Sequence, residues 1–446
     1  MIRNIKGKII EAAQLCLTYD QLIKIRYKIR KSFRTKVDKN TEIFKRNLQS
    51  INSVKNNNKN GKPLIVFICQ FPAVWNGMDS VYRAAINNDK VEAICLALPE
   101  KIMDKEYDIR WEKYGKNESY KMLKNKGYKV IDGQKSEGKW YDLKALHPAY
   151  VFLPRPYDIH LPECYRSYTI SEYTKVCYIP YGYDNVKWDS KMTYEFDFLN
   201  YTYAIFAENK YYYNELFNIY KSVGWDKIKR VFNLGYPRFD FYANYKPSLH
   251  KRKTVVWLPR WTTNRSIEAT TFFKYKDYLI NFFIKHPEYD FICRPHPLML
   301  RNFVSCGLLS QHDESQFLKV FDEYSNFFLD SDGDFLKSFK KADIFISDFT
   351  SLLVEELIID KPIIFTGQTN HFTKFSWKIS QGMYLVNNQR ELDQTLLAVL
   401  HDNDAKENVR KKISMKIYNP ANGNIGDNII NALVEDYQKI RSPKAL

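Results

Sequence analysis

The hydrophobic pattern is sharpest between residues 342 and 365, where short apolar runs alternate with a polar turn and a helical stretch. Ile344 to Ile346 form an apolar run of strand type, and the polar segment 347–351 (SDFTS) interrupts it. Residues 352–359 then place apolar side chains at three- and four-residue spacing, and Lys361-Pro362 ends this pattern before the apolar run 363–365. The pattern predicts strand, polar turn, helix and strand, which is half of a nucleotide-binding α/β layer.

The same alternation of apolar runs and helical patterns extends over most of the chain. In residues 63–245, strand candidates begin near positions 64, 91, 128, 150, 176 and 204, and helical patterns separate several of them. A second region, residues 246–446, begins with the apolar run after Thr254 and ends in two helices. Apolar strands that alternate with helices favour parallel, doubly wound sheets. By fold analogy we predict an α/β protein of GT-B architecture, with two Rossmann-like domains facing a cleft.

Residues 1–62 differ from the rest of the chain in charge. They hold 16 Lys or Arg against 4 Asp or Glu, which is +12 of the chain's net +17. Residues 5–48 carry apolar side chains on roughly one helical face and basic side chains on the other. Such a helix suits an anionic membrane surface, where we expect residues 1–50 to attach; a solvated helix packed on the protein or on a partner is the alternative. The polar segment 52–62 is typical of a linker.

The composition narrows the class of protein further. A chain of 446 residues with 45% hydrophobic content fits a packed protein of two or three domains. No apolar run is long enough to cross a membrane, and the N-terminus lacks a signal-peptide core. The seven cysteines are dispersed and never form a CxxC pair, which indicates reduced thiols in the cytoplasm. We expect no metal site, and the scarcity of aromatic residues in the basic arm argues against nucleic acid.

Two polar turns in the second half are candidates for a nucleotide site. Arg294 and His296 follow an apolar strand in the rigid turn RPHP, where Arg can grip a phosphate and His can offset charge on a leaving group. The turn 347–351 opens a helix, so its N–H groups and hydroxyls can bind phosphate, while helix capping is the structural alternative. Glu355, one helical turn later, could take a pair of ribose hydroxyls. The candidates in this turn are Ser347, Asp348, Thr350 and Ser351.

Other candidates end neighbouring strands or lie at the expected crossover between domains. Residues 257–262 (WLPRWT) end another predicted strand. Arg260 in this segment could face the same cleft, and Trp261 could stack on a base, although a core tryptophan is the alternative. Arg238 is a candidate phosphate ligand at the crossover segment, and Gly235 is a turn former beside it.

The first half offers candidates for the acceptor. Asp79 and Ser80 precede a helix and could receive an acceptor's phosphate. Arg155 lies in the Pro-rich loop 153–165 with Asp158 and His160, which are close enough in sequence to form an oriented acid–base pair if the loop bends. Tyr181 follows the next strand and adds a hydroxyl rather than a base.

These residues resemble the CDP-glycerol glycerophosphotransferase family, which builds teichoic-acid-type chains in bacteria. The motifs that carry the resemblance occur in the expected order: WNGMDSVYRAA, RPYDIHLPECY, CYIPYGY, LGYPRFDFY, WLPRWT, FICRPHP and ISDFTSLLVEELIIDKPIIF. The resemblance implies a GT-B fold with an N-terminal acceptor domain and a C-terminal nucleotide-donor domain. It also implies a CDP-alcohol donor, CMP release, no cofactor, and peripheral attachment to the cytoplasmic face of the membrane that holds the acceptor lipid.

The carry-over to individual residues is partial. His296 matches the motif histidine of the family's second domain, the turn 347–351 matches its donor-phosphate turn, and Glu355 stands where a carboxylate is usual. Better-studied members carry a WHGTP-type segment whose histidine is taken as the base, and the corresponding segment 178–182 here is YIPYG. This marks a divergent branch, in which either His160 or Asp158 replaces that base or the chemistry differs.

The leading functional hypothesis is therefore phosphoalcohol transfer. An acceptor hydroxyl, deprotonated by His160 or Asp158, attacks the β-phosphate of a CDP-alcohol while His296 and Arg294 stabilise the departing CMP. The acceptor is expected to be a lipid-linked or glycan hydroxyl at the cell surface. The alternative is a GT-B glycosyltransferase that uses a nucleotide sugar in capsule or surface polysaccharide synthesis.

Overall fold

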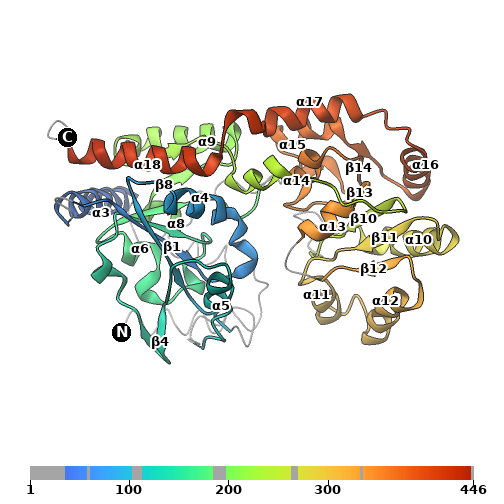
Figure 1. Cartoon of the computed structure of the whole chain (residues 1–446), viewed down its shortest axis with the longest axis horizontal. Helices are drawn as coiled ribbons and strands as arrows, with labels where there is room; N and C mark the ends of the chain where they lie inside the picture. Colours follow the sequence, from blue (N-terminus) through green and yellow to red (C-terminus); the bar gives the residue numbers. More distant parts are fainter. Residues whose placement is uncertain are drawn as a thin grey trace.

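The computed structural model describes residues 36–57, 61–102, 113–183, 197–262, 270–331 and 335–442. These residues form two α/β domains, which the elements α17 (Glu407–Ile417), α18 (Ile425–Arg441) and η6 (Pro237–Asn244) join (Figure 1). Each domain holds one parallel sheet with helices packed against it. The prediction of two Rossmann-like domains is confirmed.

The sheet of the first domain has the strand order β3-β2-β1-β6-β7-β8-β9, and all its pairings are parallel. A short hairpin of β4 and β5 lies apart from it. The strands are β1 (Leu64–Cys69), β2 (Glu92–Ala97), β3 (Val130–Asp132), β4 (Gln134–Ser136), β5 (Lys139–Trp140), β6 (Tyr150–Leu153), β7 (Lys175–Tyr178), β8 (Thr202–Phe206) and β9 (Arg230–Phe232). The helices are α3 (Lys36–Asn57), α4 (Asn76–Ile86), α5 (Glu118–Asn125), α6 (Ser167–Ile170), α8 (Asp197–Tyr201) and α9 (Lys210–Ser222).

The sheet of the second domain has the order β12-β11-β10-β13-β14-β15, again with parallel pairings. Its strands are β10 (Thr254–Leu258), β11 (Asp290–Cys293), β12 (Phe327–Leu329), β13 (Ile344–Ser347), β14 (Ile363–Phe365) and β15 (Tyr384–Leu385). Its helices are α10 (Phe272–Lys285), α11 (Met299–Ser305), α12 (Gln311–Glu323), α13 (Leu336–Lys341), α14 (Leu353–Ile359), α15 (Lys374–Ile379) and α16 (Gln389–Leu400).

The order of strands reverses once in each sheet, between β1 and β6 and between β10 and β13. In open parallel sheets, ligands bind beyond the carboxyl ends of the strands at this switch point. The loops after these strands are therefore where the functional side chains should gather.

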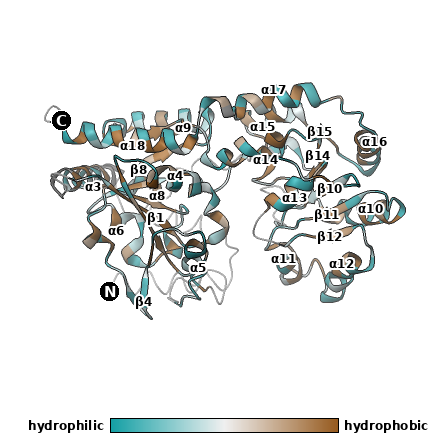
Figure 2. Ribbon diagram, viewed as in Figure 1, coloured by the Kyte–Doolittle hydropathy of each residue, from teal (hydrophilic) through white to brown (hydrophobic). Residues whose placement is uncertain are grey.

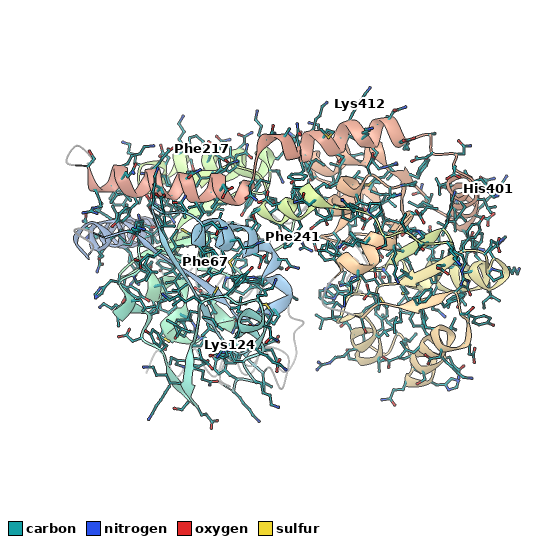
Figure 3. All side chains as sticks on the ribbon, in the orientation of Figure 1. Phe67, Lys124, Phe217, Phe241, His401 and Lys412 are labelled. Atoms are coloured by element: carbon teal, nitrogen blue, oxygen red, sulfur yellow. The ribbon has the colours of Figure 1, made fainter. Side chains whose placement is uncertain are left out.

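The central strands formed because their apolar runs are buried on both faces. Val66, Phe67 and Ile68 are fully buried, and Phe67 stacks on Phe152 of the neighbouring strand with ring centroids 4.8 Å apart. Figure 2 shows the apolar strands inside both domains, and Figure 3 shows Phe67 inside the first domain while Lys124 and Lys412 project outward. Continuous apolar runs of this kind are typical of parallel strands covered by helices.

The last helix does not stay with the second domain. α18 leaves that domain and packs on α4 of the first. At its start, the Gly426 N–H donates to Asp240 Oδ2 of η6 at 2.9 Å. The sequence had placed residues 246–446 together with both closing helices in the second domain. The observed crossing corrects that boundary, because the apolar face of α18 is buried against the first domain.

The described end of the basic arm, α3, packs on the protein, which is the alternative to membrane attachment that the sequence left open. α3 packs on the first domain through Ile43 and Val54, and Arg46 Nη1 donates to Tyr168 O at 2.7 Å. The predicted linker 52–62 is helical as far as Asn57, because Val54 continues the buried face. Residues 1–35, most of the predicted amphipathic stretch, lie outside the described residues. No helix among the described residues is long and apolar enough to span a bilayer.

Candidate functional site

The candidate donor site lies where β10, β11 and β13 end at the switch point of the second sheet. Arg260 follows β10, His296 follows β11, and the turn 347–351 follows β13. Arg260 Nη1 donates to the carbonyl of Phe349 at 3.1 Å, so the first of these loops is tied to the turn. The structure therefore brings together three of the segments that the sequence singled out.

The first two residues of the turn face into the protein. Ser347 is fully buried, and its hydroxyl lies 2.9 Å from both carboxylate oxygens of Glu356. Asp348 Oδ2 accepts from the backbone N–H of Thr271 at 3.0 Å, at the start of α10. Burial raises the pKa of Asp348 to about 6. These two side chains hold the turn in place instead of projecting from it, which differs from the expected donor contact.

The later residues of the turn lie nearer its surface. Thr350 Oγ1 accepts from the N–H of Leu352 at 3.2 Å, and Ser351 is exposed. Leu352 stands at the N-terminus of α14 with no side-chain cap. Neither Ser347 nor Asp348 caps α14, so the helix-capping alternative does not hold for these two residues.

His296 is positioned as a hydrogen-bond donor. Its Nδ1 accepts from the N–H of Leu298 at 3.2 Å, so the ring proton of the neutral imidazole lies on Nε2. Desolvation of the ring, followed by the charge of Arg260, lowers the pKa of His296 to about 4, and the residue keeps an exposed surface. The Trp261 ring lies 5.6 Å from the imidazole between centroids. A neutral His with Nε2–H at the surface of the site can donate to a phosphate oxygen.

Arg294 has a structural partner. Its Nη1 lies 2.7 Å from Asp330 Oδ2, and both side chains are mostly buried. The backbone N–H of Arg294 also donates to the Trp257 carbonyl at 2.8 Å, which continues the sheet. The predicted phosphate ligand is therefore paired within the second domain in this structure.

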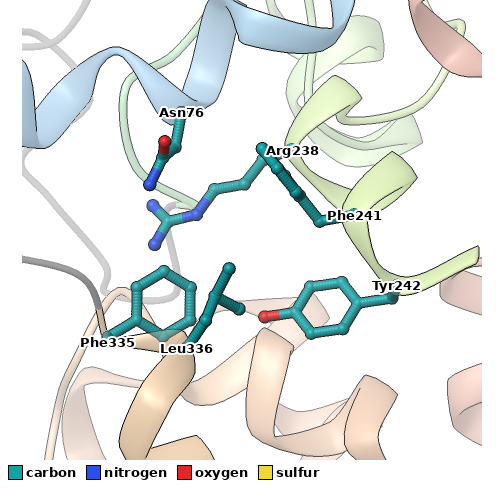
Figure 4. Close-up of a pocket in the computed structure, with 6 residues that line it drawn as sticks. All are labelled: Asn76, Arg238, Phe241, Tyr242, Phe335 and Leu336. Carbon is teal, nitrogen blue, oxygen red and sulfur yellow. The ribbon is translucent and has the colours of Figure 1, made fainter. Parts of the chain in front are cut away.

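Arg238 and Glu355 meet between the domains. Arg238 Nε lies 3.1 Å from Glu355 Oε1, and the guanidinium carbon lies 4.4 Å from the centre of the Phe335 ring. Figure 4 shows the guanidinium between Asn76 of the first domain and Phe335 of the second. Glu355 is fully buried, and apart from this ion pair no described side chain donates a hydrogen bond to its carboxylate. Burial raises the pKa of Glu355, and the charge of Arg238 offsets part of this effect.

Gly235 allows the backbone to turn at the crossover between the domains. Its φ is +96°, and a Cβ at this position would lie 2.9 Å from Ile425 Cδ1. Both the backbone conformation and the close approach of α18 therefore require glycine.

Two of the acceptor candidates are structural. Asp79 is buried and accepts from Trp75 Nε1 at 2.6 Å and from Tyr128 OH at 2.9 Å. Ser80 is buried and donates to Asp240, at the junction with α18. Neither side chain reaches the surface where the sequence had placed the acceptor's phosphate, because α4 turns both toward its neighbours.

The loop after β6 places Arg155 and His160 at the switch point of the first sheet. The Arg155 guanidinium carbon lies 3.4 Å from the centre of the Phe71 ring, which follows β1. Burial, followed by Arg155 and Lys101, lowers the pKa of His160 to about 4, so the imidazole is neutral. Tyr181 completes this edge, and its hydroxyl lies 3.1 Å from the hydroxyl of Tyr157.

Asp158 does not form the expected pair with His160. Its Oδ1 accepts from the N–H of Ser167 at 2.8 Å and its Oδ2 from the Ser167 hydroxyl at 2.5 Å. The short 3-10 helix Asp158–His160 turns the carboxylate toward the start of α6. Sequence spacing placed the two side chains near each other, but this backbone geometry sends them in different directions.

The carboxyl edges of the two sheets approach each other across the domains. A Cβ built on Gly182, just after Tyr181, would lie 3.4 Å from Cβ of Ser351. The loop after β7, which carries Tyr181, and the candidate donor turn are therefore in contact. Phe71, Lys101 and Tyr157 also line this edge and are not among the residues predicted from the sequence. The position of Phe71 just after a central strand is the one signal in the sequence that points to it.

Solved structures share the two-domain fold of this chain. The chain is similar to the wall teichoic acid polymerase TagF, with a TM-score of 0.51 and 14% identity over 90% of this chain and 98% of that one. For a protein assigned as a UDP-N-acetylglucosamine 2-epimerase from Listeria monocytogenes the TM-score is 0.56 and the sequence identity is 11%. The match covers 85% of this chain and 98% of that one. The UDP-GlcNAc 2-epimerase from Neisseria meningitidis bound to UDP-GlcNAc gives 0.52 and 13%, with coverage of 84% and 100%. At these identities the likeness shows the fold alone, which is of GT-B type.

A comparison with curated proteins found no match. A comparison with protein families matched residues 182–435 to CDP-glycerol:poly(glycerophosphate) glycerophosphotransferase. This match spans more than half of the chain and contains the crossover, the donor-side loops and the turn 347–351. The chain belongs to the CDP-glycerol:poly(glycerophosphate) glycerophosphotransferase family and is a transferase of that type.

Proposed function

We propose that this transferase moves a glycerol phosphate, or a related polyol phosphate, from a CDP-alcohol to a hydroxyl of a membrane-linked glycan or teichoic-acid-like acceptor. One observation carries the proposal beyond family membership. The turn at the end of β13 meets the loop after β7 at Ser351 and Gly182, so a donor on one edge faces an acceptor on the other. In the reaction the acceptor oxygen bonds to the β-phosphorus, the bond from that phosphorus to the bridging oxygen breaks, and CMP leaves.

The donor side supplies hydrogen-bond donors and positive charge. His296 Nε2–H donates to a diphosphate oxygen, and Arg260, tied to Phe349, adds its charge. The hydroxyls of Thr350 and Ser351 lie at the adjoining turn. Such groups stabilise the negative charge that develops on a departing nucleotide without any covalent step on the protein.

Glu355 is the candidate for the ribose. Its two buried carboxylate oxygens could accept from a pair of ribose hydroxyls. When no nucleotide is bound, the Arg238 guanidinium balances the negative charge of Glu355. Because Glu355 is fully buried, a nucleotide can reach it only if Arg238 or the crossover segment η6 moves.

His160 is the candidate base on the acceptor side. It is neutral, which a base must be before it accepts a proton, and it replaces the histidine that segment 178–182 lacks. Bound phosphate groups would offset the charge of Arg155 and Lys101 and raise its pKa toward a useful range. Asp158 is fixed on Ser167 and supports the loop.

We also propose that the enzyme works at the cytoplasmic face of the membrane, where a lipid-linked acceptor would lie. The excess of Lys and Arg in residues 1–62 supports electrostatic attachment to anionic lipid. Flotation of the full chain with vesicles of phosphatidylglycerol and phosphatidylcholine tests this. Binding that increases with phosphatidylglycerol and falls with added salt is expected; equal binding to vesicles of phosphatidylcholine alone would contradict it.

The function is tested with a panel of donors. The purified protein is incubated with CDP-glycerol, CDP-ribitol, UDP-sugars and CMP-sugars plus a membrane extract, and the released nucleotide is identified by mass. We expect CMP from a CDP-alcohol, lost in His296→Ala but retained in His401→Ala, which changes an exposed histidine far from the site (Figure 3). Release of UDP, or of CMP from a sugar donor, would instead establish a nucleotide-sugar transferase.

A further inference from the structure

An arginine with unused hydrogen-bonding capacity lies at the switch point of the first sheet. We propose that Arg155, stacked on Phe71, binds a phosphate group of the acceptor and so makes the enzyme selective for phosphorylated acceptors. This inference rests on the proposed transfer reaction and adds the acceptor's recognised group and the residue that recognises it. It concerns residues before 182, which the family match does not reach.

Aromatic rings hold the guanidinium of Arg155 in an orientation suited to binding an anion. Its guanidinium carbon lies 3.4 Å from the centre of the Phe71 ring, and Tyr157 approaches at 5.8 Å. Stacking on an aromatic face holds the guanidinium plane and leaves its edge free for two parallel bonds to an oxyanion. Phe71 follows β1 and Arg155 follows β6, so the pair sits where the strand order reverses.

Two hydrogen-bonding groups of Arg155 have no partner among the residues that the structure describes. Its Nε and Nη2 are buried without a hydrogen-bond partner, and no carboxylate among the described residues forms an ion pair with it. Desolvation lowers the pKa of Arg155, which remains charged. Burying charged donors without a partner is costly, and the cost is recovered when an anion occupies the site.

The surrounding charges favour an anion. Lys101 is buried and donates to Ile159 O at 3.5 Å, and both it and Arg155 lower the pKa of His160. The opposing charge comes from exposed Glu100, whose attraction to Arg155 acts at longer range than an ion pair. Two cations beside one neutral imidazole therefore define a site for a compact anion next to the candidate base.

The anion belongs to the acceptor rather than to the donor. Arg155, His160 and Tyr181 all lie on the first domain, while Arg260, His296 and the turn 347–351 lie on the second. The family acts on poly(glycerophosphate), in which a phosphodiester precedes the terminal hydroxyl. A phosphate held by Arg155 would place that hydroxyl beside His160, on the side facing Ser351.

The test compares acceptors with and without phosphate. With saturating CDP-glycerol, the KM is measured for glycerol 3-phosphate, for a short poly(glycerophosphate) and for glycerol, using wild type, Arg155→Gln and Arg155→Lys. We expect Arg155→Gln to raise the KM for both phosphorylated acceptors about 10- to 100-fold, the range of a charge-assisted hydrogen bond, and to leave glycerol unchanged. Arg155→Lys keeps the charge but not the fork and should fall between them.

The controls separate this inference from the transfer reaction itself. Arg166→Gln removes the same charge just after the same loop, where the guanidinium donates to Leu161 O at 3.1 Å, and should change none of these values. Binding of glycerol 3-phosphate in the presence of excess CMP, followed by calorimetry, gives a readout that does not need turnover. A loss of that binding in Arg155→Gln supports the inference even if the donor proves to be different.

Three results would overturn the inference. The first is an equal rise in KM for glycerol and for the phosphorylated acceptors. The second is a rise in the KM of CDP-glycerol alone, which would assign Arg155 to the donor. The third is unchanged glycerol 3-phosphate binding in both Arg155 variants, with thermal unfolding confirming that they fold.

Discussion

The buried carboxylate of Asp436 ties the last helix to the first domain, so its neutralisation should loosen that helix. Asp436 accepts from Tyr150 OH at 2.7 Å and from Tyr203 OH at 2.8 Å, and Lys175 Nζ lies 3.5 Å away with its side chain fully buried. Asp436→Asn keeps the shape and one acceptor but removes the charge opposite the lysine. The substitution also removes the charge that faces Arg230, whose Nε lies 3.2 Å from Asp436 Oδ1; Arg230 is partly exposed, so the buried lysine bears most of the loss.

The expected loss of stability in Asp436→Asn can be worked out from the buried lysine and the two tyrosines. Burial, partly offset by Asp436, lowers the pKa of Lys175 to about 8. In the variant the lysine either stays charged without a counter-charge or loses its proton, which at pH 7 costs about 1.4 kcal/mol for a group of pKa about 8. Weakened hydrogen bonds from the two tyrosines add about 1 kcal/mol each. The total, about 3 kcal/mol, is at the low end of the roughly 3–5 kcal/mol found for broken buried pairs.

Hydrogen exchange of α18 measures this cost locally. Protection of the amides in 425–441 should fall on the order of 100-fold at pH 7 in Asp436→Asn. Glu435→Gln, which changes the exposed neighbour, should leave protection unchanged.

The pH dependence of the loss has a definite sign. Above about pH 8 the buried lysine is neutral in the wild type as well, so the difference between the two proteins should shrink from pH 7 to pH 9. A loss below threefold at pH 7, or one that grows with pH, would refute the reasoning.

Three further predictions concern packing and pH. Gly426→Ala should destabilise the fold by about 1–3 kcal/mol in urea titration, because the added Cβ would lie 2.5 Å from Ser80 Oγ. The hydrogen bond to Asp343 raises the pKa of His250, so its stabilisation is present at pH 5.5 and is lost as pH rises through that raised pKa; melting temperatures of His250→Gln and wild type should therefore differ more at pH 5.5 than at pH 8.5. Burial raises the pKa of Glu356 to about 8, so the wild type loses stability as pH rises from about 4.5 toward 8; the melting temperature of Glu356→Gln should gain on it over that range, and a constant difference would contradict this.

The sequence predicted the sheets well because burial on both faces leaves a continuous apolar run. The runs at Ile65–Ile68 and Ile344–Ile346 are fully buried in the structure and needed no knowledge of their partners. β12 was missed because it lies at the sheet edge, where Phe328 and Leu329 are 42% and 37% exposed and the run is short. An edge strand that is only partly buried leaves a weaker hydrophobic pattern in the sequence than a central strand does.

The site was predicted by position but not by side-chain direction. The turn 347–351 lies at the switch point as expected, yet Asp348 is bonded to Thr271, which is 77 residues away in sequence. Spacing in the chain cannot identify such a partner, nor could it show that Asp158 faces Ser167. For the same reason the stacking of Arg155 on Phe71, between loops after different strands, became visible only in the structure.

The central claim is that the acceptor attacks phosphorus, and the fate of the donor's β-phosphate tests it directly. CDP-glycerol labelled with ³²P in the β-phosphate is incubated with the full-length protein and a phosphorylated acceptor, and the label is followed in nucleotide and product. We expect the label to move to the acceptor and unlabelled CMP to be released, and both to be abolished in His296→Ala. Label retained in released CDP would show attack at carbon and would contradict the account.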